Sequence, residues 1–322
     1  MTPISGLRSP RYVLLTRKSP LDLLLERYGT LEQARFVLRS RGQDPTWAEV
    51  AHARLAAGLA TVERAIPVDA RRARVDRDDL DRFLFAPDDV ILAVGQDGLV
   101  ANVAKYLEGQ PVLGINPDPR GNDGVLCPHP PQRLSRLLEW LDAAAERADA
   151  GPPPSRTPPA PGPFRIQRRT MVRAELEDGQ RLLGLNEVFA GHRSHQSARY
   201  RLRAGGQEER QSSSGLLCAS GTGSTGWARS IARQRGLEGR LPEPEQGRLA
   251  WLVREPFPSV ATGVGLDFGL LGGADELEVI SEMPEDGVVF ADGIERDALE
   301  FVAGQRLRIG LAPSALRLVV PT

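Results

Sequence analysis

The chain has 322 residues, with 41 basic and 42 acidic side chains and a formal net charge of −1. This length is enough for two domains with separate cores, and the balanced charge provides no overall positive field for binding nucleic acid or an anionic membrane. Cys127 and Cys218 form no CxxC pattern, so neither a disulfide framework nor a zinc site is predicted. No segment has the length of a membrane span or the pattern of a signal peptide, and we expect a cytoplasmic protein.

The first half of the chain alternates strand-like and helix-like segments. Tyr12–Leu15 is short and apolar, which predicts a buried strand at the centre of a parallel sheet. Three amphipathic helical segments follow within residues 21–66, the last with Thr46 as its N-cap. Residues 89–94 and 111–116 predict two more strands with a helix between them. This alternation is typical of an α/β domain with a parallel sheet.

The second half of the chain has a different composition. A proline-rich segment, residues 150–163, predicts a linker, and short strand-like segments separated by Gly, Pro and Asp follow it. We therefore predict an α/β plus all-β fold, with an α/β domain over residues 1–149 and a β-rich domain over residues 164–295. Periodicity does not decide where the last strands belong, and we assign residues of about 296–322 to the first domain.

The turn Gly95-Gln96-Asp97-Gly98 joins the carboxyl end of a buried strand to a helix, which is where α/β sheets bind ligands. Glycines allow the backbone to approach a phosphate, and an aspartate here can accept a proton from, or orient, an attacking hydroxyl. The plainer interpretation is an ordinary turn in which Asp97 only caps the helix. Both interpretations are open for this motif alone.

A second candidate is the loop Thr222-Gly223-Ser224-Thr225, followed by Gly226 and Trp227. Small residues, hydroxyl groups and free amides suit a ligand lying close to the backbone, and Trp227 adds a flat aromatic surface. A nucleotide has the matching chemistry. The alternative is a flexible serine and glycine loop, although the strand before it and the helix after it count against a mere linker.

Asn186 and Glu187 form the third candidate, because two polar residues interrupt an apolar strand-like segment. One of them must face the interior or a cleft, and a buried glutamate needs a partner such as a sugar hydroxyl or a carboxamide. The alternative is a bulge or strand end with both groups in solvent. No protein metal site is predicted, because His192 and His195 lack a third ligand, and both the P-loop pattern and the GxSxG pattern are absent.

Together these segments resemble the NAD kinase family, whose members carry in order a GGDG turn, a strand ending in GIN, an NE dipeptide, a TGST loop and a late DG. The wording is most similar to the mitochondrial-type branch of that family. The matching segments of this chain are GQDG at 95–98, PVLGINPDPRGNDGVL at 111–126, LNEVFAG at 185–191, SSGLLCASGTGSTGW at 213–227 and ADGIERDALEFVAGQRLRIG at 291–310.

The resemblance implies a Rossmann-like N-terminal domain, a β-sandwich-like C-terminal domain, an active site between them, and a homo-oligomer, either a dimer or a tetramer. It implies NAD and a nucleoside triphosphate such as ATP as partners, with Mg²⁺ as cofactor and no nucleic acid or membrane. The reaction would phosphorylate the adenosine-ribose 2′-hydroxyl of NAD, with Mg²⁺ neutralising the phosphates of the donor.

The resemblance also implies roles for individual residues. Asp97 would orient or deprotonate the ribose hydroxyl. The remaining roles fall into two groups: Asn186, Glu187, Thr222, Gly223, Ser224, Thr225 and Trp227 would bind NAD, with Trp227 where the family usually has tyrosine, and Gly95, Gln96, Gly98, Asp292 and Gly293 would lie at the phosphate-facing or site-proximal positions.

Two residues depart from the family pattern, since Gln96 replaces the second glycine of GGDG and Leu99 replaces a threonine. A side chain at position 96 restricts φ and occupies space beside a donor phosphate. Two alternatives to an NAD kinase therefore stay open. One is a catalytically silent NAD(P)-binding sensor, and the other is a superfamily kinase that acts on another sugar or a lipid hydroxyl.

Overall fold

The computed structural model describes residues 10–149 and 162–322, which form two compact units. Unit 1 contains the chain up to Gln167 together with Arg317–Thr322, and unit 2 contains Arg168–Leu316. The segment predicted to be a linker lies outside the described residues except for positions 162 and 163. Of the last 27 or so residues assigned to the first domain from the sequence, only Arg317–Thr322 belongs to unit 1.

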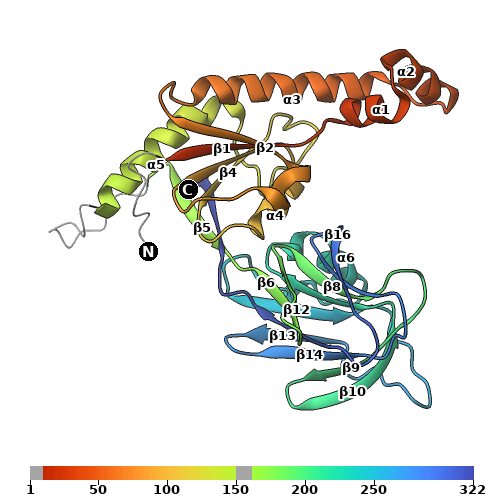
Figure 1. Ribbon diagram of the computed structural model, residues 1–322. Coiled ribbons are helices and arrows are strands. Elements are labelled where there is room, and N and C mark those ends of the chain that lie inside the picture. Colours follow the sequence, from red (N-terminus) through yellow and green to blue (C-terminus); the bar gives the residue numbers. More distant parts are fainter. Residues whose placement is uncertain (1–9, 150–161) are drawn as a thin grey trace. The chain divides into compact units, whose positions relative to one another are not determined.

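Unit 1 is built on a six-stranded sheet with the order β2-β1-β3-β4-β18-β5 (Figure 1). The strands are β1 (Arg11–Thr16), β2 (Arg71–Asp76), β3 (Asp89–Val94), β4 (Pro111–Ile115), β5 (Phe164–Arg169) and β18 (Leu316–Pro321). Adjacent strands from β2 to β18 run parallel. The predicted parallel sheet is confirmed, but the central position predicted for β1 is wrong, because β1 is the second strand and lies beside the edge strand β2.

Helices cover both faces of this sheet. They are α1 (Pro20–Tyr28), α2 (Leu31–Ser40), α3 (Thr46–Ala65), α4 (Asp97–Ala104) and α5 (Leu134–Asp149), with the short 3₁₀ helices η1 (Arg77–Arg82) and η2 (Pro131–Arg133). Side chains of α3 and α5 pack with Tyr12, Leu14 and Leu92 on one face of the sheet. The side chains of a strand alternate between the two faces, and α4 lies over the other face. Figure 1 shows α1 and α2 beside the amino-terminal part of α3.

The N-cap predicted at Thr46 is wrong by one residue. Pro45 is the N-cap of α3 and makes no side-chain cap, while the Thr46 hydroxyl donates to Asp44. The carboxylate of Asp44 also accepts the backbone amide of Thr46. Asp44 therefore satisfies the first helical amide, which is a role that an N-cap threonine would otherwise have filled.

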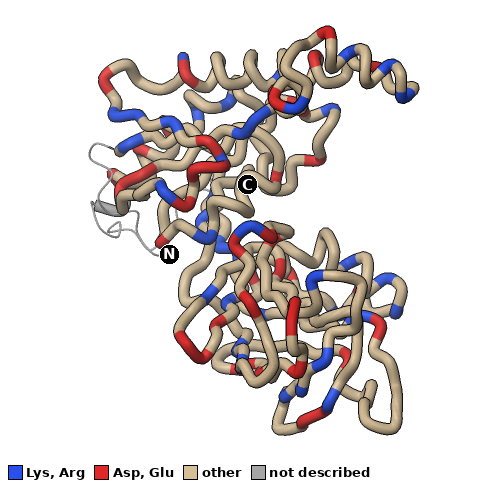
Figure 2. The backbone as a smooth tube through the Cα atoms, turned by 45° about the vertical axis from the view of Figure 1, so that its right-hand side comes forward, with Lys and Arg blue, Asp and Glu red and all other residues tan. Residues whose placement is uncertain are grey.

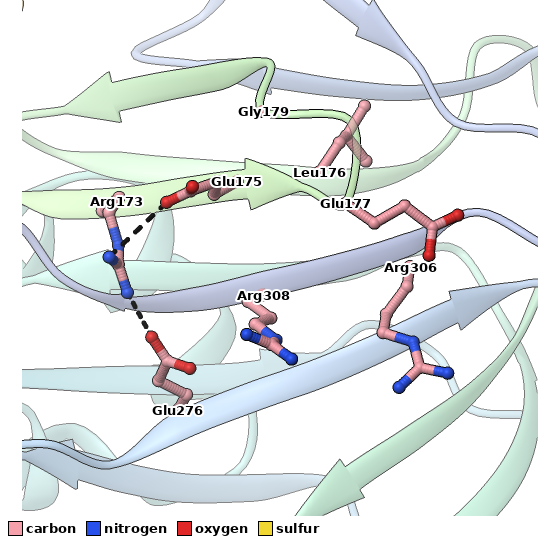
Figure 3. Close-up of a pocket in the computed structure, with 8 residues that line it drawn as sticks. All are labelled: Arg173, Glu175, Leu176, Glu177, Gly179, Glu276, Arg306 and Arg308. Atoms are coloured by element: carbon pink, nitrogen blue, oxygen red, sulfur yellow. Dashed lines mark hydrogen bonds and ion pairs between the residues drawn. The ribbon is translucent and has the colours of Figure 1, made fainter.

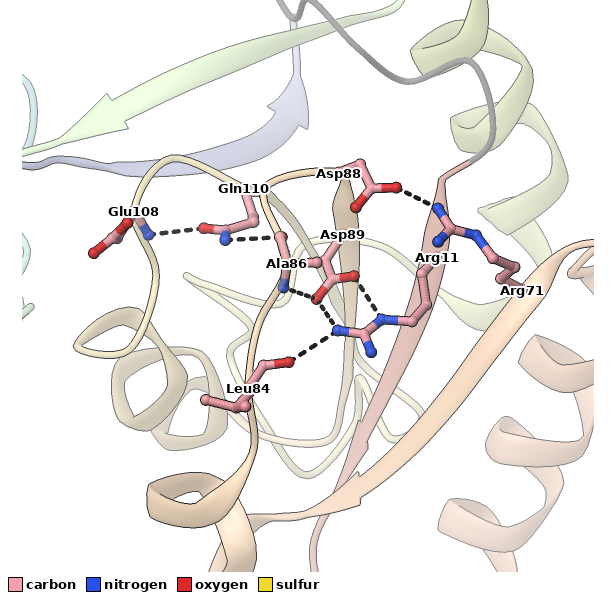
Figure 4. Close-up of polar contacts among 8 residues, drawn as sticks. All are labelled: Arg11, Arg71, Leu84, Ala86, Asp88, Asp89, Glu108 and Gln110. Atoms are coloured by element: carbon pink, nitrogen blue, oxygen red, sulfur yellow. Dashed lines mark hydrogen bonds and ion pairs between the residues drawn. The ribbon is translucent and has the colours of Figure 1, made fainter.

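A partly buried ion pair joins β1 to β3 at the amino-terminal edge of the sheet (Figure 4). Arg11 donates two hydrogen bonds to Asp89, each 2.7 Å long, and the Asp89 side chain is fully buried. The backbone amide of Ala86 also donates to the Asp89 carboxylate at 2.7 Å. These three hydrogen bonds compensate the loss of hydration around a buried carboxylate.

Unit 2 contains two six-stranded sheets with the orders β10-β9-β14-β17-β6-β7 and β13-β12-β11-β8-β15-β16. Their strands are β6 (Val172–Leu176), β7 (Arg181–Gly184), β8 (Glu187–His192), β9 (Ala198–Ala204), β10 (Gln207–Ser213), β11 (Leu216–Ser220), β12 (Arg248–Val253), β13 (Phe268–Gly272), β14 (Glu276–Ser281), β15 (Gly287–Ala291), β16 (Ile294–Glu300) and β17 (Arg306–Leu311). The unit also contains α6 (Trp227–Gln234), η3 (Gly223–Thr225) and η4 (Glu238–Arg240).

The two sheets of unit 2 share one apolar core. Val172 and Leu307 of the first sheet pack in the same cluster as Val188, Leu216 and Trp251 of the second, which is the arrangement of a β-sandwich. On the outer face of the second sheet, a smaller cluster receives the apolar residues of α6. The predicted β-sandwich-like second domain is confirmed.

Charged residues of both signs are distributed along both units (Figure 2). This pattern agrees with a net charge of −1, and no described segment is dominated by one sign over a long stretch. In the described ranges, none of the helices has the combination of length and apolar character that a membrane crossing requires.

Candidate functional site

Asp97 is the first residue of α4, and its carboxylate reaches a segment about 30 positions later in the chain. Its Oδ2 accepts the backbone amide of Val125 at 2.9 Å, and its Oδ1 accepts those of Leu126 at 2.9 Å and Cys127 at 3.0 Å. The N-cap is Gln96, which makes no side-chain cap. Asp97 is therefore not the helix cap considered from the sequence, because its hydrogen bonds leave the helix altogether.

The same 125–127 segment packs directly against β4. A Cβ atom on Gly114 would lie 1.9 Å from the carbonyl oxygen of Leu126, so only glycine permits this approach. The Asn116 side chain donates to the carbonyl of Asn122 at 3.1 Å, which fixes the start of the loop. The GQDG and GIN segments thus form one assembly in unit 1, which we call the edge site and define as Gly95–Gly98 with Val125–Cys127.

Gln96 fits its position without backbone strain. Its φ of −98° and ψ of 164° lie in the extended region that any residue adopts. The side chain is exposed, and its Oε1 accepts a hydrogen bond of 2.7 Å from Nη1 of Arg17. The restriction on φ expected from replacing glycine at this position does not occur.

Asp292 in unit 2 accepts three consecutive backbone amides, as Asp97 does in unit 1. Its Oδ2 accepts from Leu185 at 2.8 Å, and its Oδ1 accepts from Asn186 at 2.6 Å and Glu187 at 3.2 Å. The Asp292 amide returns a hydrogen bond of 3.0 Å to the Glu187 carbonyl. The late DG segment therefore holds the NE segment in place from a position more than 100 residues later.

The hydroxyl-rich loop packs on the same NE segment. A Cβ atom on Gly223 would lie 2.2 Å from the Asn186 carbonyl oxygen and 3.1 Å from Oε2 of Glu187, so the loop depends on glycine there. The buried Ser220 hydroxyl donates to the Leu185 carbonyl, and the Ser220 amide donates to the Asn186 carbonyl at 2.8 Å. The structure thus brings three of the five matching segments together within unit 2.

We call this group the NE site and define it as Asn186, Glu187, Thr222–Thr225, Asp292 and Gly293. Glu187 is 9% exposed, and among the described residues its carboxylate has no hydrogen-bond partner. Burial, with a smaller contribution from the charge of Asp292, raises the pKa of Glu187 to about 7. A buried carboxyl group that lacks a protein partner suits a ligand with hydroxyl or amide groups.

The hydroxyls of the loop have local partners. Ser224 donates to the Ser220 carbonyl at 3.1 Å and Thr225 to the Thr222 carbonyl at 2.9 Å, while Thr222 is buried and accepts a long contact of 3.5 Å from Arg169. Each hydroxyl oxygen keeps lone pairs for a further hydrogen bond. The loop is consequently held by hydrogen bonds of its own side chains.

Trp227 packs as the first residue of α6 on the outer face of the second sheet. Its ring stacks on Phe189 at 5.5 Å between centroids, and Phe290 contacts Phe189 at 4.9 Å. The Arg254 guanidinium lies 5.1 Å from the Trp227 ring centroid, within the range of a cation–π contact. Much of the flat aromatic surface expected for a nucleotide therefore contacts protein.

A groove with a volume of about 430 Å³ begins at this loop. Its lining comprises Gly221, Ser224, Thr225, Arg229, Glu238, Gly239, Leu241, Pro242, Glu243 and Pro244. Two of the predicted NAD-binding residues, Ser224 and Thr225, thus line an open groove. The groove offers hydroxyl groups together with one basic and two acidic side chains, a lining suited to a polar ligand.

A second cavity, of about 350 Å³, lies on the outer face of the first sheet of unit 2 (Figure 3). Its lining is mostly charged, and Arg173 forms ion pairs with both Glu175 and Glu276. Arg306, at the other side, pairs with Glu278. None of the predicted site residues lines this cavity, and its charges largely compensate one another.

Sequence reasoning missed the partners of these aspartates and the neighbour of Gln96. Val125–Cys127 and Leu185 contribute only backbone amides, which have no residue-type signature. Arg17 could have been noticed, because it directly follows the first buried strand and so falls at the carboxyl edge of the sheet. Within the described ranges, no three His, Cys, Asp or Glu side chains converge as a metal site.

Among known proteins, part of the chain is similar to an NAD kinase. No family model matches the chain. A segment of 179 residues is 31% identical to NAD kinase 2, mitochondrial, of Rattus norvegicus, and covers 45% of this chain and 41% of the rat protein. The match therefore spans less than half of that relative.

Two solved structures resemble almost the whole chain. Yeast NADH kinase complexed with NADH has a TM-score of 0.58 and 13% identity, and covers 98% of this chain and 84% of its own. An NAD kinase from Archaeoglobus fulgidus in complex with ATP has a TM-score of 0.55 and 18% identity, and covers 97% and 93%. The chain accordingly has the fold of these kinases.

Proposed function

We propose that the chain is an NAD kinase, which transfers a phosphate from ATP to the adenosine-ribose 2′-hydroxyl of NAD. The observation that carries the proposal is the assembly of the NE site: Asp292 and Gly223 both pack on the segment containing Asn186 and Glu187. These residues come from three distant parts of the chain and match three motifs of one family in order. The likeness to the rat NAD kinase and to the two kinase structures supports the same assignment.

In this proposal the NE site binds the dinucleotide. Glu187 lacks a hydrogen-bond partner in the described part of the chain, so a ribose hydroxyl or the nicotinamide carboxamide supplies one. The Ser224 and Thr225 hydroxyls line the adjoining groove and bind polar groups of the same ligand. Phe189 and Arg254 hold Trp227 in place, and it shapes the region through packing more than through stacking on a base.

Asp97 acts on the reacting hydroxyl. A carboxylate can accept about four hydrogen bonds, and Oδ2 of Asp97 accepts one amide whereas Oδ1 accepts two. Oδ2 therefore keeps the capacity to accept the ribose 2′-hydroxyl, which it orients or deprotonates as that oxygen attacks the terminal phosphate of the donor. The three amides hold the carboxylate in one orientation for this task.

Mg²⁺ is proposed to arrive with the donor. In proteins, Mg²⁺ commonly binds through substrate phosphates plus one or two carboxylates. Among the described residues, no three acidic or histidine side chains converge. When bound, the ion neutralises charge on the phosphates during transfer. The edge site binds the phosphates through the backbone amide of Gly98, while Gly95, whose amide donates to the Ile115 carbonyl at 2.9 Å, shapes the phosphate-facing turn.

A homo-oligomer, either a dimer or a tetramer, belongs to the same proposal, as does the assignment of NAD binding to the β-rich domain. The oligomer is checked by light scattering of the purified chain after gel filtration.

NAD binding is assigned by comparing variants of Glu187 with variants of Asp97. Loss of NAD affinity in the Glu187 variants alone supports NAD binding by the β-rich domain.

An acceptor screen with labelled ATP and Mg²⁺ tests the function. The acceptors are NAD, NADH, nicotinamide mononucleotide and a diacylglycerol dispersion. We expect label on NAD or NADH and none on the mononucleotide, which lacks the adenosine ribose. Label on the lipid alone would assign the chain to a different acceptor, and NAD binding without any labelled product would make it a sensor.

A further inference from the structure

Arg17 lies at the carboxyl edge of the unit 1 sheet, beside the GQDG turn. In the parallel register, Thr16 pairs with Asp76 and Leu15 pairs with Ala93. The residues that follow these strands are Arg77 after β2, Arg17 after β1 and Gly95 after β3. They therefore lie side by side at the carboxyl edge of the sheet. A Cβ atom on Gly95 would lie 3.7 Å from Cδ of Arg17, so the Arg17 side chain runs beside Gly95.

Neither arginine has an acidic partner. Across the described residues, Arg17 and Arg77 form no ion pair, in contrast to the compensated arginines of the unit 2 sheet. Burial and the nearby charge of Arg77 lower the pKa of Arg17. Two guanidinium groups without counter-charge at one edge of a sheet have the chemistry of an anion site.

Gln96 holds Arg17 in position. The Gln96 side chain is neutral, so its hydrogen bond to Nη1 of Arg17, at 2.7 Å, orients the guanidinium without cancelling its charge. The nearby carboxylates contact groups other than the two arginines. Oδ2 of Asp78 lies 3.6 Å from Nζ of Lys18, and Oδ1 of Asp76 accepts the backbone amide of Asp78. Gln96, the substituted residue of the GQDG turn, therefore orients Arg17.

We propose that Arg17, oriented by Gln96 and flanked by Arg77, binds an oligophosphate chain at the edge site. Guanidinium groups bind phosphate through paired hydrogen bonds, and the turn beside Arg17 leads into the first amides of α4, an eight-residue helix. The inference rests on the proposed function in taking this oligophosphate to be the phosphoryl donor. Arg17 is a binding residue, and Gln96 is a positioning residue that acts through it.

Calorimetric titration of the full chain with tripolyphosphate, and separately with MgATP, tests the proposal. We expect Arg17→Ala to weaken both ligands by about 10-fold to 100-fold, the range for a charge-assisted phosphate contact. Gln96→Gly frees the guanidinium and weakens both ligands by about 3-fold to 10-fold. Gln96→Glu adds a charge that pairs with Arg17 and weakens them further.

Arg41→Ala, which removes an exposed arginine at the end of α2, is the matched control and leaves both affinities within about twofold of the wild-type values. Thermal melting confirms that every variant is folded, and NAD affinity is unchanged throughout. In steady-state assays, Gln96→Gly raises the KM for the donor with little change in kcat, and Gln96→Asn partly restores it. A purely structural role of Gln96 would change the melting temperature instead.

Several results would overturn the inference. One is an absence of tripolyphosphate binding by the wild-type chain, and another is equal affinity of wild type and Arg17→Ala for both ligands. A third is a loss of affinity in Arg17→Ala that is confined to MgATP, which would indicate nucleoside contacts. Tighter binding by Gln96→Gly would show that the glutamine obstructs the site. Arg17-dependent tripolyphosphate binding without NADP formation would support this inference while rejecting the proposed function, and NADP formation with an unaffected Arg17→Ala variant would do the reverse.

Discussion

The Oδ1 atom of Asp97 accepts a hydrogen bond from the backbone amide of Leu126, with 2.9 Å between the two atoms. Through this contact and its two neighbours, the residue proposed to act on the ribose hydroxyl also holds the loop that packs on Gly114. Chemistry and local structure therefore depend on the same carboxylate. A substitution at position 97 is expected to affect both, and the two effects can be measured separately.

Asp97→Asn tests the chemical role. The amide retains one oxygen that can accept Leu126 and Cys127, but its NH₂ group cannot accept Val125 or a hydroxyl proton. We expect kcat to fall by about 100-fold or more, with NAD affinity within a few-fold of wild type and a small loss of thermal stability. Asp69→Asn, an exposed control in unit 1, changes neither quantity. A normal kcat in Asp97→Asn would remove this residue from the reaction.

Gly223→Ala tests the packing of the NE site. The new methyl group would lie 2.2 Å from the Asn186 carbonyl oxygen, so the loop must shift away from the NE segment. We expect unit 2 to lose about 1–3 kcal/mol of stability and NAD affinity to fall at least 10-fold. The control is Gly272→Ala in β13, outside the groove, where a Cβ atom would come no closer than 3.7 Å to a neighbouring side chain. Equal NAD affinities in the two variants would separate the loop from NAD binding.

Glu187 gives a pH dependence of stability whose sign follows from its raised pKa of about 7. Between the unfolded value, near 4.5, and about 7, the folded chain holds a proton on Glu187 that the unfolded chain has lost. This group therefore stabilises the fold less as pH rises through that window, by at most about 1.4 kcal/mol per pH unit.

Glu187→Gln removes that dependence. Denaturant unfolding of both proteins from pH 4.5 to 7.5 should show a free-energy difference that moves in favour of the glutamine variant as pH rises, and levels off above about pH 7. The difference isolates this one group, because every other titrating residue is common to both proteins. A difference that does not vary with pH would mean that Glu187 is ionised throughout.

The Arg11–Asp89 pair at the opposite edge of the unit 1 sheet predicts a large stability effect without a direct effect on the site. Arg11→Ala leaves the fully buried carboxylate of Asp89 without its charged partner. We expect the free energy of unfolding of unit 1 to fall by about 3–5 kcal/mol. Arg74→Ala, which breaks an exposed pair with Glu63, should cost no more than about 1 kcal/mol. Equal losses in urea unfolding of the two variants would contradict the account of Asp89.

Local patterns predicted much of the fold. Strands such as β3 and helices such as α3 have the strong apolar periodicity that a sequence shows directly. The strand β2, Arg71–Asp76, was missed because an edge strand with four charged residues has no such pattern. Residues of about 296–322, which include β18, were assigned to the first domain, but periodicity alone did not decide this, since pairing with β4 depends on a partner about 200 residues earlier.

The contacts of the candidate site could not be predicted from the sequence. The motifs pointed to Asp97 and Asp292, but the partners of these carboxylates are backbone amides about 30 and about 105 residues away, and tertiary packing decides which amides these are. Gln96 shows the same limit. A comparison of motifs presents it as a defect, whereas its contact with Arg17, 79 residues away, indicates a function.

The identity of the product formed from NAD, ATP and Mg²⁺ tests the central claim most directly. The purified chain is incubated with all three compounds, and the products are separated by ion-exchange chromatography and examined by phosphorus NMR. The account predicts a dinucleotide with one additional phosphate on the adenosine-ribose 2′-oxygen, and almost none of it from the Asp97→Asn variant. A chain that binds NAD and ATP but releases no such dinucleotide would contradict it.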